Sequence, residues 1–186
     1  MTLAVRVIAS LLIDPSRGVI KGRQFQHDRV IGEPIQWIRV MAGLRDVDEL
    51  VVFDVTHNPP DFALIERIAS NCFVPLAYGG GIHDIQTAVL MARSADKIIS
   101  GNPLLIQGIA MRCGSQSAVA VINNTSIGVG EMARMFVGHG AGEILLQSRE
   151  RDGMMNGYDL EAIVAVRAAV NVPLIDVSAV NPELAP

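Results

Sequence analysis

The sequence predicts an α/β fold in which parallel strands alternate with helices. Apolar runs of four to nine residues recur along the chain, and each of the first six is followed by a segment with helical spacing. Continuous apolar runs are typical of strands covered on both faces, whereas half-exposed antiparallel strands alternate apolar and polar residues. The predicted strands are residues 5–13, 50–55, 74–78, 97–100, 118–122, 143–147 and 172–177.

Helix start signals stand between these runs. Pro34 is favourable in a first turn, and the side chains of Asp61, Asp84 and Asp159 are suited to capping the helices that follow them. Six strand–helix pairs and a final strand imply right-handed parallel crossovers.

Two architectures fit this alternation, an open doubly wound sheet and a (β/α)8 TIM barrel. The first strand is not followed by the G-x-G-x-x-G phosphate loop of dinucleotide-binding open sheets. A barrel normally takes about 250 residues, and this chain ends just after its seventh predicted strand. The sequence therefore favours a single barrel domain over residues 1–186 that is incomplete, with about seven strands and no eighth βα unit.

Composition excludes several classes of protein. The 186 residues carry a formal net charge of −4, half of them are hydrophobic, and two are cysteines. These values exclude a disordered chain and a disulfide scaffold, and without a basic stripe no nucleic-acid partner is expected. No apolar run approaches the roughly 18 residues that span a bilayer, and no basic leader opens the chain. We expect a cytoplasmic protein without a membrane partner.

The candidate site residues follow the predicted strands, because active sites of parallel α/β folds lie beyond the strand C-termini. The three glycines at 79–81 suit either a phosphate-binding loop or a tight turn that needs positive φ. Lys21 is either a ligand for a phosphate or enol oxygen or an ordinary solvated surface lysine. Asp54 is either a catalytic carboxylate or a structural hydrogen-bonding group. The four histidines show no metal-ligand spacing, so neither a metal nor a cofactor is expected.

A second charged group stands at or near the starts of strands, at the opposite end. It consists of Arg6, Glu49, Lys97 and Glu143. In a barrel these side chains would form a ring of salt bridges across the bottom, and the alternative is a charge cluster that serves stability alone.

Several tracts together resemble the HisF family, the cyclase subunit of imidazole glycerol phosphate synthase in histidine biosynthesis. They run over nearly the whole chain, and their order and spacing carry the resemblance more than any one tract does. The tracts are RVIA at 6–9, VIKG at 19–22, DELVVFD at 48–54, GGGI at 79–82, ADK at 95–97, GSQ at 114–116, GAGEILL at 140–146, RDG at 151–153 and GYDL at 157–160.

The resemblance implies a (β/α)8 barrel enzyme, a lyase that takes ammonia from a glutaminase partner and closes an imidazole ring on a small phosphorylated ribulosyl substrate. It implies phosphate binding by Gly80, Gly81 and Asn102 in one half and by Asp152 and Gly153 in the other. By the same resemblance, Arg6, Glu49, Lys97 and Glu143 would form the gate through which ammonia enters its channel.

The chain also departs from the family. The two essential aspartates correspond here to Leu12 and Asn123, and neither leucine nor asparagine serves as a carboxylate base. Asp14 would replace the first aspartate only if its loop bends back, and Lys21 and Asp54 complete the candidate catalytic set. Whether the chain is an enzyme is therefore left open.

The Leu12 variant and the IGEPI tract at 31–35 resemble the branch of the family linked to surface-sugar biosynthesis. The alternative function is accordingly a non-catalytic or sugar-amidating paralogue that partners a glutaminase. Because strands one and seven would have exposed edges, we also expect self-association.

Overall fold

The computed structural model describes residues 5–123 and 128–177. The loop expected after the fifth strand, at 124–127, and the C-terminal stretch 178–186 lie outside the described residues. The chain divides into two compact units, which we describe separately: Met1–Lys21 with Arg29–Ile98, and Gly22–Asp28 with Ile99–Pro186. The expectation of a single domain stays a prediction.

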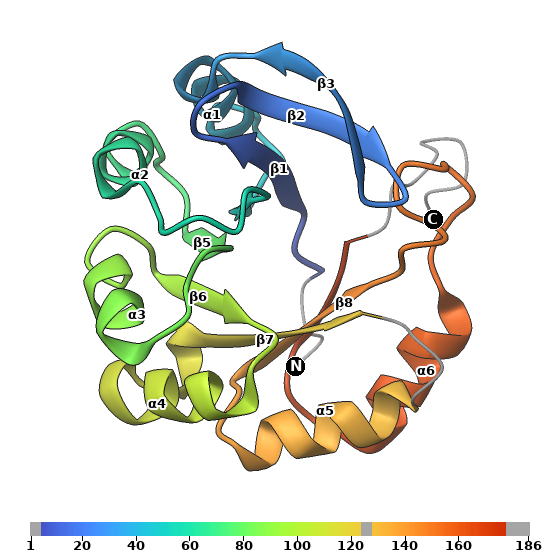
Figure 1. Cartoon of the computed structure of the whole chain (residues 1–186). Coiled ribbons are helices and arrows are strands. Elements are labelled where there is room, and N and C mark those ends of the chain that lie inside the picture. Colours follow the sequence, from blue (N-terminus) through green and yellow to red (C-terminus); the bar gives the residue numbers. More distant parts are fainter. Residues whose placement is uncertain (1–4, 124–127, 178–186) are drawn as a thin grey trace. The chain divides into compact units, whose positions relative to one another are not determined.

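The first unit contains parallel strands alternating with helices (Figure 1). Its strand β1 pairs in parallel with β4, and β4 pairs in parallel with β5. The elements are β1 (Ile8–Asp14), β2 (Gly18–Arg23), β3 (Gln26–Gly32), α1 (Pro34–Ala42), β4 (Glu49–Asp54), α2 (Phe62–Ala69), β5 (Leu76–Gly79), α3 (Ile85–Met91) and β6 (Lys97–Ser100). The adjoining ends of β2 and β3, within Gly22–Asp28, belong to the second unit, and so does β6 from Ile99 onward.

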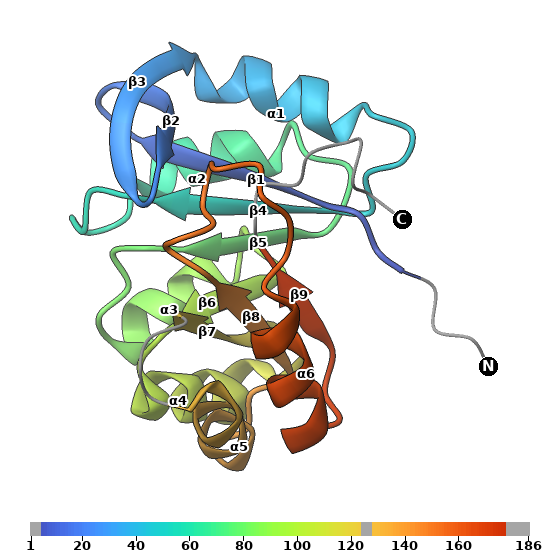
Figure 2. The same ribbon diagram turned by 90° about the vertical axis from the view of Figure 1, so that its right-hand side faces the viewer.

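The strands β2 and β3 are an addition that the sequence did not predict. The segment after β1 turns back antiparallel to it, with Asp14 opposite Gly18 and Leu12 opposite Ile20 (Figure 2). The outer part of β2 is exposed and polar, so it lacks the continuous apolar run that marks the other strands. Where β3 leads into α1, the indole of Trp37 lies against Gly32 and donates a hydrogen bond to the Ile31 carbonyl oxygen at 3.3 Å.

The second unit repeats the alternation, with β7, β8 and β9 paired in parallel. Its elements are α4 (Pro103–Cys113), a 3-10 turn (Ser115–Ser117), β7 (Ala118–Asn123), α5 (Val129–Gly138), β8 (Glu143–Gln147), α6 (Leu160–Ala169) and β9 (Leu174–Asp176). Helices α5 and α6 pack side by side (Figures 1 and 2), and a Cβ on Gly130 would lie 3.0 Å from the Ala165 carbonyl oxygen. Glycine thus lets the two helices approach closely.

The predicted helix caps are confirmed. The side chains of Asp61, Asp84 and Asp159 accept hydrogen bonds from the backbone N–H three residues further on, at 3.0, 2.8 and 3.2 Å. Pro34 occupies the first turn of α1. These bonds satisfy N–H groups that have no partner within their own helix.

The predicted α/β class and its strand–helix alternation are confirmed. Seven strands, β1 and β4 to β9, correspond to the seven predicted runs, with ends that shift by up to three residues. In the part of the chain that the structure describes, no helix is long and apolar enough to cross a membrane.

Candidate functional site

An ion cluster lies at the start of the strands of the first unit. Glu49, the first residue of β4, is 2% exposed and accepts hydrogen bonds from Lys97 Nζ at 2.9 and 2.7 Å and from Arg6 Nη1 at 3.0 Å. One buried carboxylate is thus shared by two cations, the arrangement that makes a buried charge tolerable. These are three of the four predicted gate residues, and the fourth, Glu143, is buried at the start of β8 in the second unit.

Strand register shows which residues share a face with this cluster. Ile8 pairs with Glu49 and Leu12 pairs with Phe53, and residues two apart on a strand lie on the same face. Leu12 and Phe53 therefore share the face of Glu49. Leu12, at the position where the family resemblance expects a catalytic aspartate, is thus apolar and pairs with the apolar Phe53.

Asp54 belongs to the other face of the sheet, because it pairs with the buried Ile13. Its carboxylate is 4% exposed, and its Oδ1 accepts hydrogen bonds from the Thr56 N–H at 2.9 Å and the Thr56 hydroxyl at 2.7 Å. Its Oδ2 accepts a hydrogen bond from the Tyr78 hydroxyl at 3.3 Å. Burial, and then the charge of Asp54, raise the pKa of the Tyr78 hydroxyl far above its ordinary value, so it remains a donor.

The glycine loop, residues 79–81, follows β5 and packs against the loop that follows β4. Gly80 and Gly81 have φ of 109° and 65°, and a Cβ would overlap the Asp54 carbonyl oxygen at Gly80 and the Asn58 carbonyl oxygen at Gly81. Both glycines are therefore required by the protein's own backbone, as the tight-turn interpretation expects. Phosphate binding at this loop stays a prediction.

Asp14 ends β1 in a turn of its own. Its Oδ1 accepts hydrogen bonds from the Ser16 N–H at 2.9 Å and the Ser16 hydroxyl at 2.7 Å, and Arg17 Nε lies 3.9 Å from its Oδ2. The Ser16 hydroxyl is the main cause that lowers the pKa of the Asp14 carboxyl, which favours the charged form. Lys21 lies exposed on β2.

Asp152 holds the tip of the β2–β3 hairpin within the second unit, and Gly153 packs against the Gly22 carbonyl oxygen. The Gln24 N–H donates to the Asp152 carbonyl oxygen at 2.9 Å and the Phe25 N–H to the Asp152 carboxylate at 3.0 Å, while Arg149 Nε donates to the Gln24 carbonyl oxygen at 3.2 Å. Gln24 and Phe25 have φ of 51° and 62°, a conformation that is uncommon outside glycine. The Asp152 bonds therefore fall on the two residues of the turn that need stabilisation.

The two predicted asparagines of the second unit have different environments. Asn102 caps α4, and its Oδ1 accepts hydrogen bonds from the Leu104 N–H at 3.0 Å and the Leu105 N–H at 3.3 Å. Asn123 is exposed at the end of β7, opposite Gln147.

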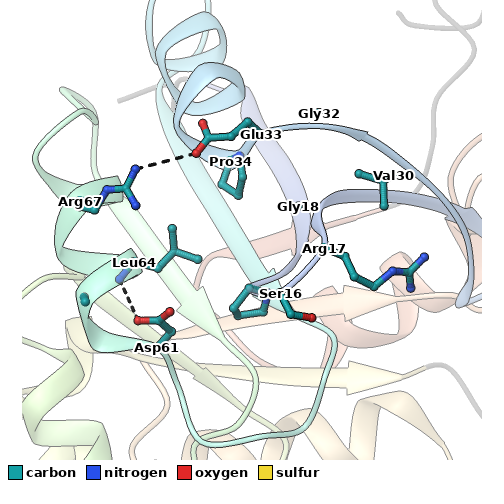
Figure 3. Close-up of a pocket in the computed structure, with 12 residues that line it drawn as sticks. Ser16, Arg17, Gly18, Val30, Gly32, Glu33, Pro34, Asp61, Leu64 and Arg67 are labelled. Carbon is teal, nitrogen blue, oxygen red and sulfur yellow. Dashed lines mark hydrogen bonds and ion pairs between the residues drawn. The ribbon is translucent and has the colours of Figure 1, made fainter.

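A cleft of about 420 Å³ opens in the first unit beside the β1–β2 turn and the N-terminal ends of α1 and α2. In Figure 3, Arg67 faces Glu33 across it, with the two groups 3.9 Å apart, and Asp61 caps α2 below them. Arg17 points away from this pair. None of the predicted site residues lines the cleft.

Sequence reasoning missed Tyr78, Thr56 and Arg149. Tyr78 stands inside an apolar run and is fully buried, so its pattern is that of a core residue. The pairing of Thr56 with Asp54 has a local signal, an aspartate followed two residues later by a hydroxyl residue, which also occurs at Asp14 and Ser16. Among the described residues, no group of three His, Cys, Asp or Glu side chains is placed to hold a metal ion.

Comparison with known proteins agrees with this fold. The model of a family described as "Histidine biosynthesis protein" matches residues 6–178. A Thermotoga sp. protein named imidazole glycerol phosphate synthase subunit HisF is 36% identical over 200 residues, which cover 93% of this chain and 78% of that protein. A Streptomyces avermitilis protein of the same name is 36% identical over 203 residues, with 94% and 80% covered. The chain therefore belongs to the histidine biosynthesis protein family and is a divergent member of its HisF branch.

Proposed function

We propose that this chain is a HisF-type subunit that receives ammonia from a glutaminase partner and uses it to close an imidazole ring on a phosphoribulosyl substrate. The ion cluster of Arg6, Glu49 and Lys97 carries the proposal, because it places a buried, doubly paired carboxylate at the strand starts where the family resemblance puts the gate. Glu143 is the fourth gate residue in this proposal. The name of the Thermotoga relative supports the same activity.

Strand β4 connects the proposed gate to the loops at the C-terminal ends of the strands. Glu49 opens β4 and Asp54 closes it, five residues later, which corresponds to roughly 16 Å at the usual rise of a strand. Ammonia entering at Glu49 would pass along the face that bears Val51 and Phe53. Both side chains are apolar, which suits a neutral molecule and disfavours ammonium.

The partner would dock at the strand-start end. Exposed apolar side chains stand just before strands at this end: Val5 and Val7 precede β1, and Phe73, 89% exposed, precedes β5. Large exposed apolar patches mark sites of protein–protein interaction. The glutaminase is the partner that the gate requires.

At the other end, we propose that Gly80, Gly81 and Asn102 bind one phosphate and that Asp152 and Gly153 bind the other. Lys21 would contact the substrate from β2. Asp14 and Asn123 would take the positions nearest to the reacting ring. Asp14 already accepts two hydrogen bonds on Oδ1, so its Oδ2 would have to serve as base.

Steady-state turnover of the phosphoribulosyl substrate tests this function. Turnover is expected with ammonium salts alone, and with glutamine when the glutaminase is added. Glu49→Gln should reduce glutamine-dependent turnover at least about tenfold and ammonium-dependent turnover less, because free ammonium reaches the site without the gate. Asp46→Asn, an exposed carboxylate near the same strand start, is the matched control. If neither nitrogen source gives turnover, ring closure is contradicted.

A second candidate function rests on Leu12 and Phe53. Because these paired apolar residues stand where proton transfer is expected, the chain would conduct ammonia to another acceptor, as a sugar-amidating or non-catalytic paralogue. The double variant Leu12→Asp, Asn123→Asp separates the two candidates. Rescue of ring closure by several hundredfold identifies a decayed cyclase, since each general acid or base supplies about 10²–10⁴-fold, whereas an unchanged rate favours the conducting paralogue.

A further inference from the structure

Asp54 joins two loops at the C-terminal ends of β4 and β5. Its carboxylate accepts hydrogen bonds from Thr56, which begins the loop after β4, and from Tyr78, which directly precedes the glycine loop. Oδ1 thus accepts from the loop after β4, and Oδ2 accepts from the residue that leads into the glycine loop. A shift of either donor would be transmitted to the other through one buried side chain.

The backbone of Asp54 contacts the same glycine loop. Gly80 lies so close to the Asp54 carbonyl oxygen that a Cβ would overlap it, and Gly81 lies equally close to the Asn58 carbonyl oxygen. His83 Nε2 lies 3.4 Å from the His57 carbonyl oxygen, a third contact between the two loops. The conformation of residues 79–81 is therefore defined by the loop that Asp54 and Thr56 begin.

The position of Asp54 in the sheet argues against a direct role in proton transfer. Val52 pairs with Tyr78, so Val52, Asp54 and Tyr78 share one face, which is buried: Val52 and Tyr78 are both fully inaccessible. Leu12 and Glu49 belong to the opposite face. A buried carboxylate whose two oxygens both accept hydrogen bonds from the protein is suited to holding structure.

We propose that Tyr78 and Asp54 are positioning residues that set the conformation of the glycine loop, and through it the direction of the loop N–H groups toward a phosphate of the substrate. The phosphate part rests on the proposed function, and the positioning part does not. Tyr78 fits this role because its hydroxyl is held protonated and so always donates. Phenylalanine would fill the same volume without the donor.

The experiment records amide spectra of ¹⁵N-labelled full-length protein, first alone and then during titration with inorganic phosphate. The test variants are Tyr78→Phe and Thr56→Val, each of which removes one hydroxyl donor to Asp54 and keeps the side-chain volume. The control is Tyr158→Phe, because the chain has two tyrosines and Tyr158 is exposed outside this cluster. Thermal unfolding of every variant is measured alongside.

The proposal expects the Gly80 and Gly81 amides to shift in both test variants before phosphate is added, and more than amides of the β4 and β5 interiors. It also expects phosphate to bind both variants at least about fivefold more weakly than it binds the unaltered protein, the loss that corresponds to one hydrogen bond. Tyr158→Phe should change neither quantity. A variant contradicts positioning if it loses thermal stability while its Gly80 and Gly81 amides keep the chemical shifts of the unaltered protein and its phosphate affinity is unchanged.

The two parts fail separately. The inference is overturned if, in both variants, the amide chemical shifts of Gly80 and Gly81 and the affinity for phosphate equal those of the unaltered protein. The proposed function would not be affected by that result. If phosphate leaves the two glycine amides of the unaltered protein unmoved, the phosphate site of the proposed function is overturned, and the shifts without phosphate still decide whether Tyr78 positions the loop. Should Tyr78→Phe fail to fold, Thr56→Val decides alone.

Discussion

Asp14 and Asp54 end their strands in the same local geometry. In each case the hydroxyl and N–H of the residue two positions later both bond to Oδ1, at 2.7 and 2.9 Å. What differs is the second oxygen, which faces Arg17 in one turn and Tyr78 in the other. Identical local chemistry thus leaves the second oxygen to a charged partner in one turn and to a buried hydroxyl in the other.

The lowered pKa of Asp14 makes a prediction about acid stability. A carboxyl group whose pKa is lower in the folded chain adds stability above its unfolded pKa, about 3.9, and this contribution is lost as pH falls through the folded pKa. Asp14→Asn should therefore reduce the free energy of unfolding by about 1 kcal/mol at pH 7, and the difference should begin to shrink near pH 4 and vanish only below the lowered folded pKa. Urea unfolding across pH measures this, with Asp46→Asn as the control; a difference that persists in acid would show that charge is not the cause.

Gly80 gives a second prediction at this scale. Gly80→Ala should destabilise the first unit by at least about 2 kcal/mol, because the new Cβ meets the Asp54 carbonyl and φ is positive. Gly138→Ala, in α5 with open space around its Cα, should instead add about 0.5–1 kcal/mol. Denaturant unfolding of both variants checks the signs, and equal effects would contradict the packing explanation.

Single residues were predictable where their signal is local. Asp61, Asp84 and Asp159 were identified as caps because the capping bond spans three residues. Tyr78 was not identified, since its partner lies 24 residues away and nothing near it distinguishes a buried donor from core. Lys97 and Arg6 were predicted as gate residues, yet only the structure shows that both share Glu49.

At the scale of elements, the β2–β3 hairpin is the main departure from simple alternation. Its tip makes a turn with positive φ at Gln24 and Phe25, neither of which is glycine. Two-residue hairpin turns of this conformation favour Asn-Gly or Gly-Gly, so the usual sequence signal is absent. The turn instead receives its stability from Asp152, more than a hundred residues away in sequence, and no short-range pattern could have predicted it.

Asp152→Ala tests this support. The Phe25 amide loses its acceptor, whereas the Gln24 amide keeps the Asp152 backbone carbonyl. Hydrogen exchange at Phe25 should accelerate about tenfold, a net loss near 1.4 kcal/mol, with a smaller change at Gln24. Glu150→Ala, an exposed neighbour, should leave both amides unchanged. Equal acceleration at Gln24 and Phe25 would mean that the whole tip, and not one bond, depends on the side chain.

At the scale of the whole molecule, composition and periodicity were sufficient for the fold class. Continuous apolar runs and helix caps predicted seven strands, and seven strands of that series are present in the described residues. The candidate sites were less predictable, because strand register decides faces. Leu12 and Asp54 both lie near the ends of apolar runs, and only the pairing of Ile13 with Asp54 shows that they belong to opposite faces.

Phe73 supplies the prediction for partner binding. Phe73→Asp should weaken association with the glutaminase at least about tenfold, because an anchor residue would become charged. The free energy of unfolding should change by less than about 0.5 kcal/mol, since this side chain is 89% exposed. Leu104→Asp, at an exposed position in the first turn of α4, is the control for a general loss of apolar surface. Association measured by calorimetry should be unaffected by the control, and equal weakening by both would place the interface elsewhere.

Trp37 is the single tryptophan of the chain, and its indole is bonded to Ile31 at the root of the hairpin. The intrinsic fluorescence of the protein, excited at the indole band, therefore arises from one place. Its emission maximum and its quenching by solutes would follow the hairpin root in real time, without a label. Ligand titrations and stopped-flow mixing can thus observe any movement of this segment in the natural sequence.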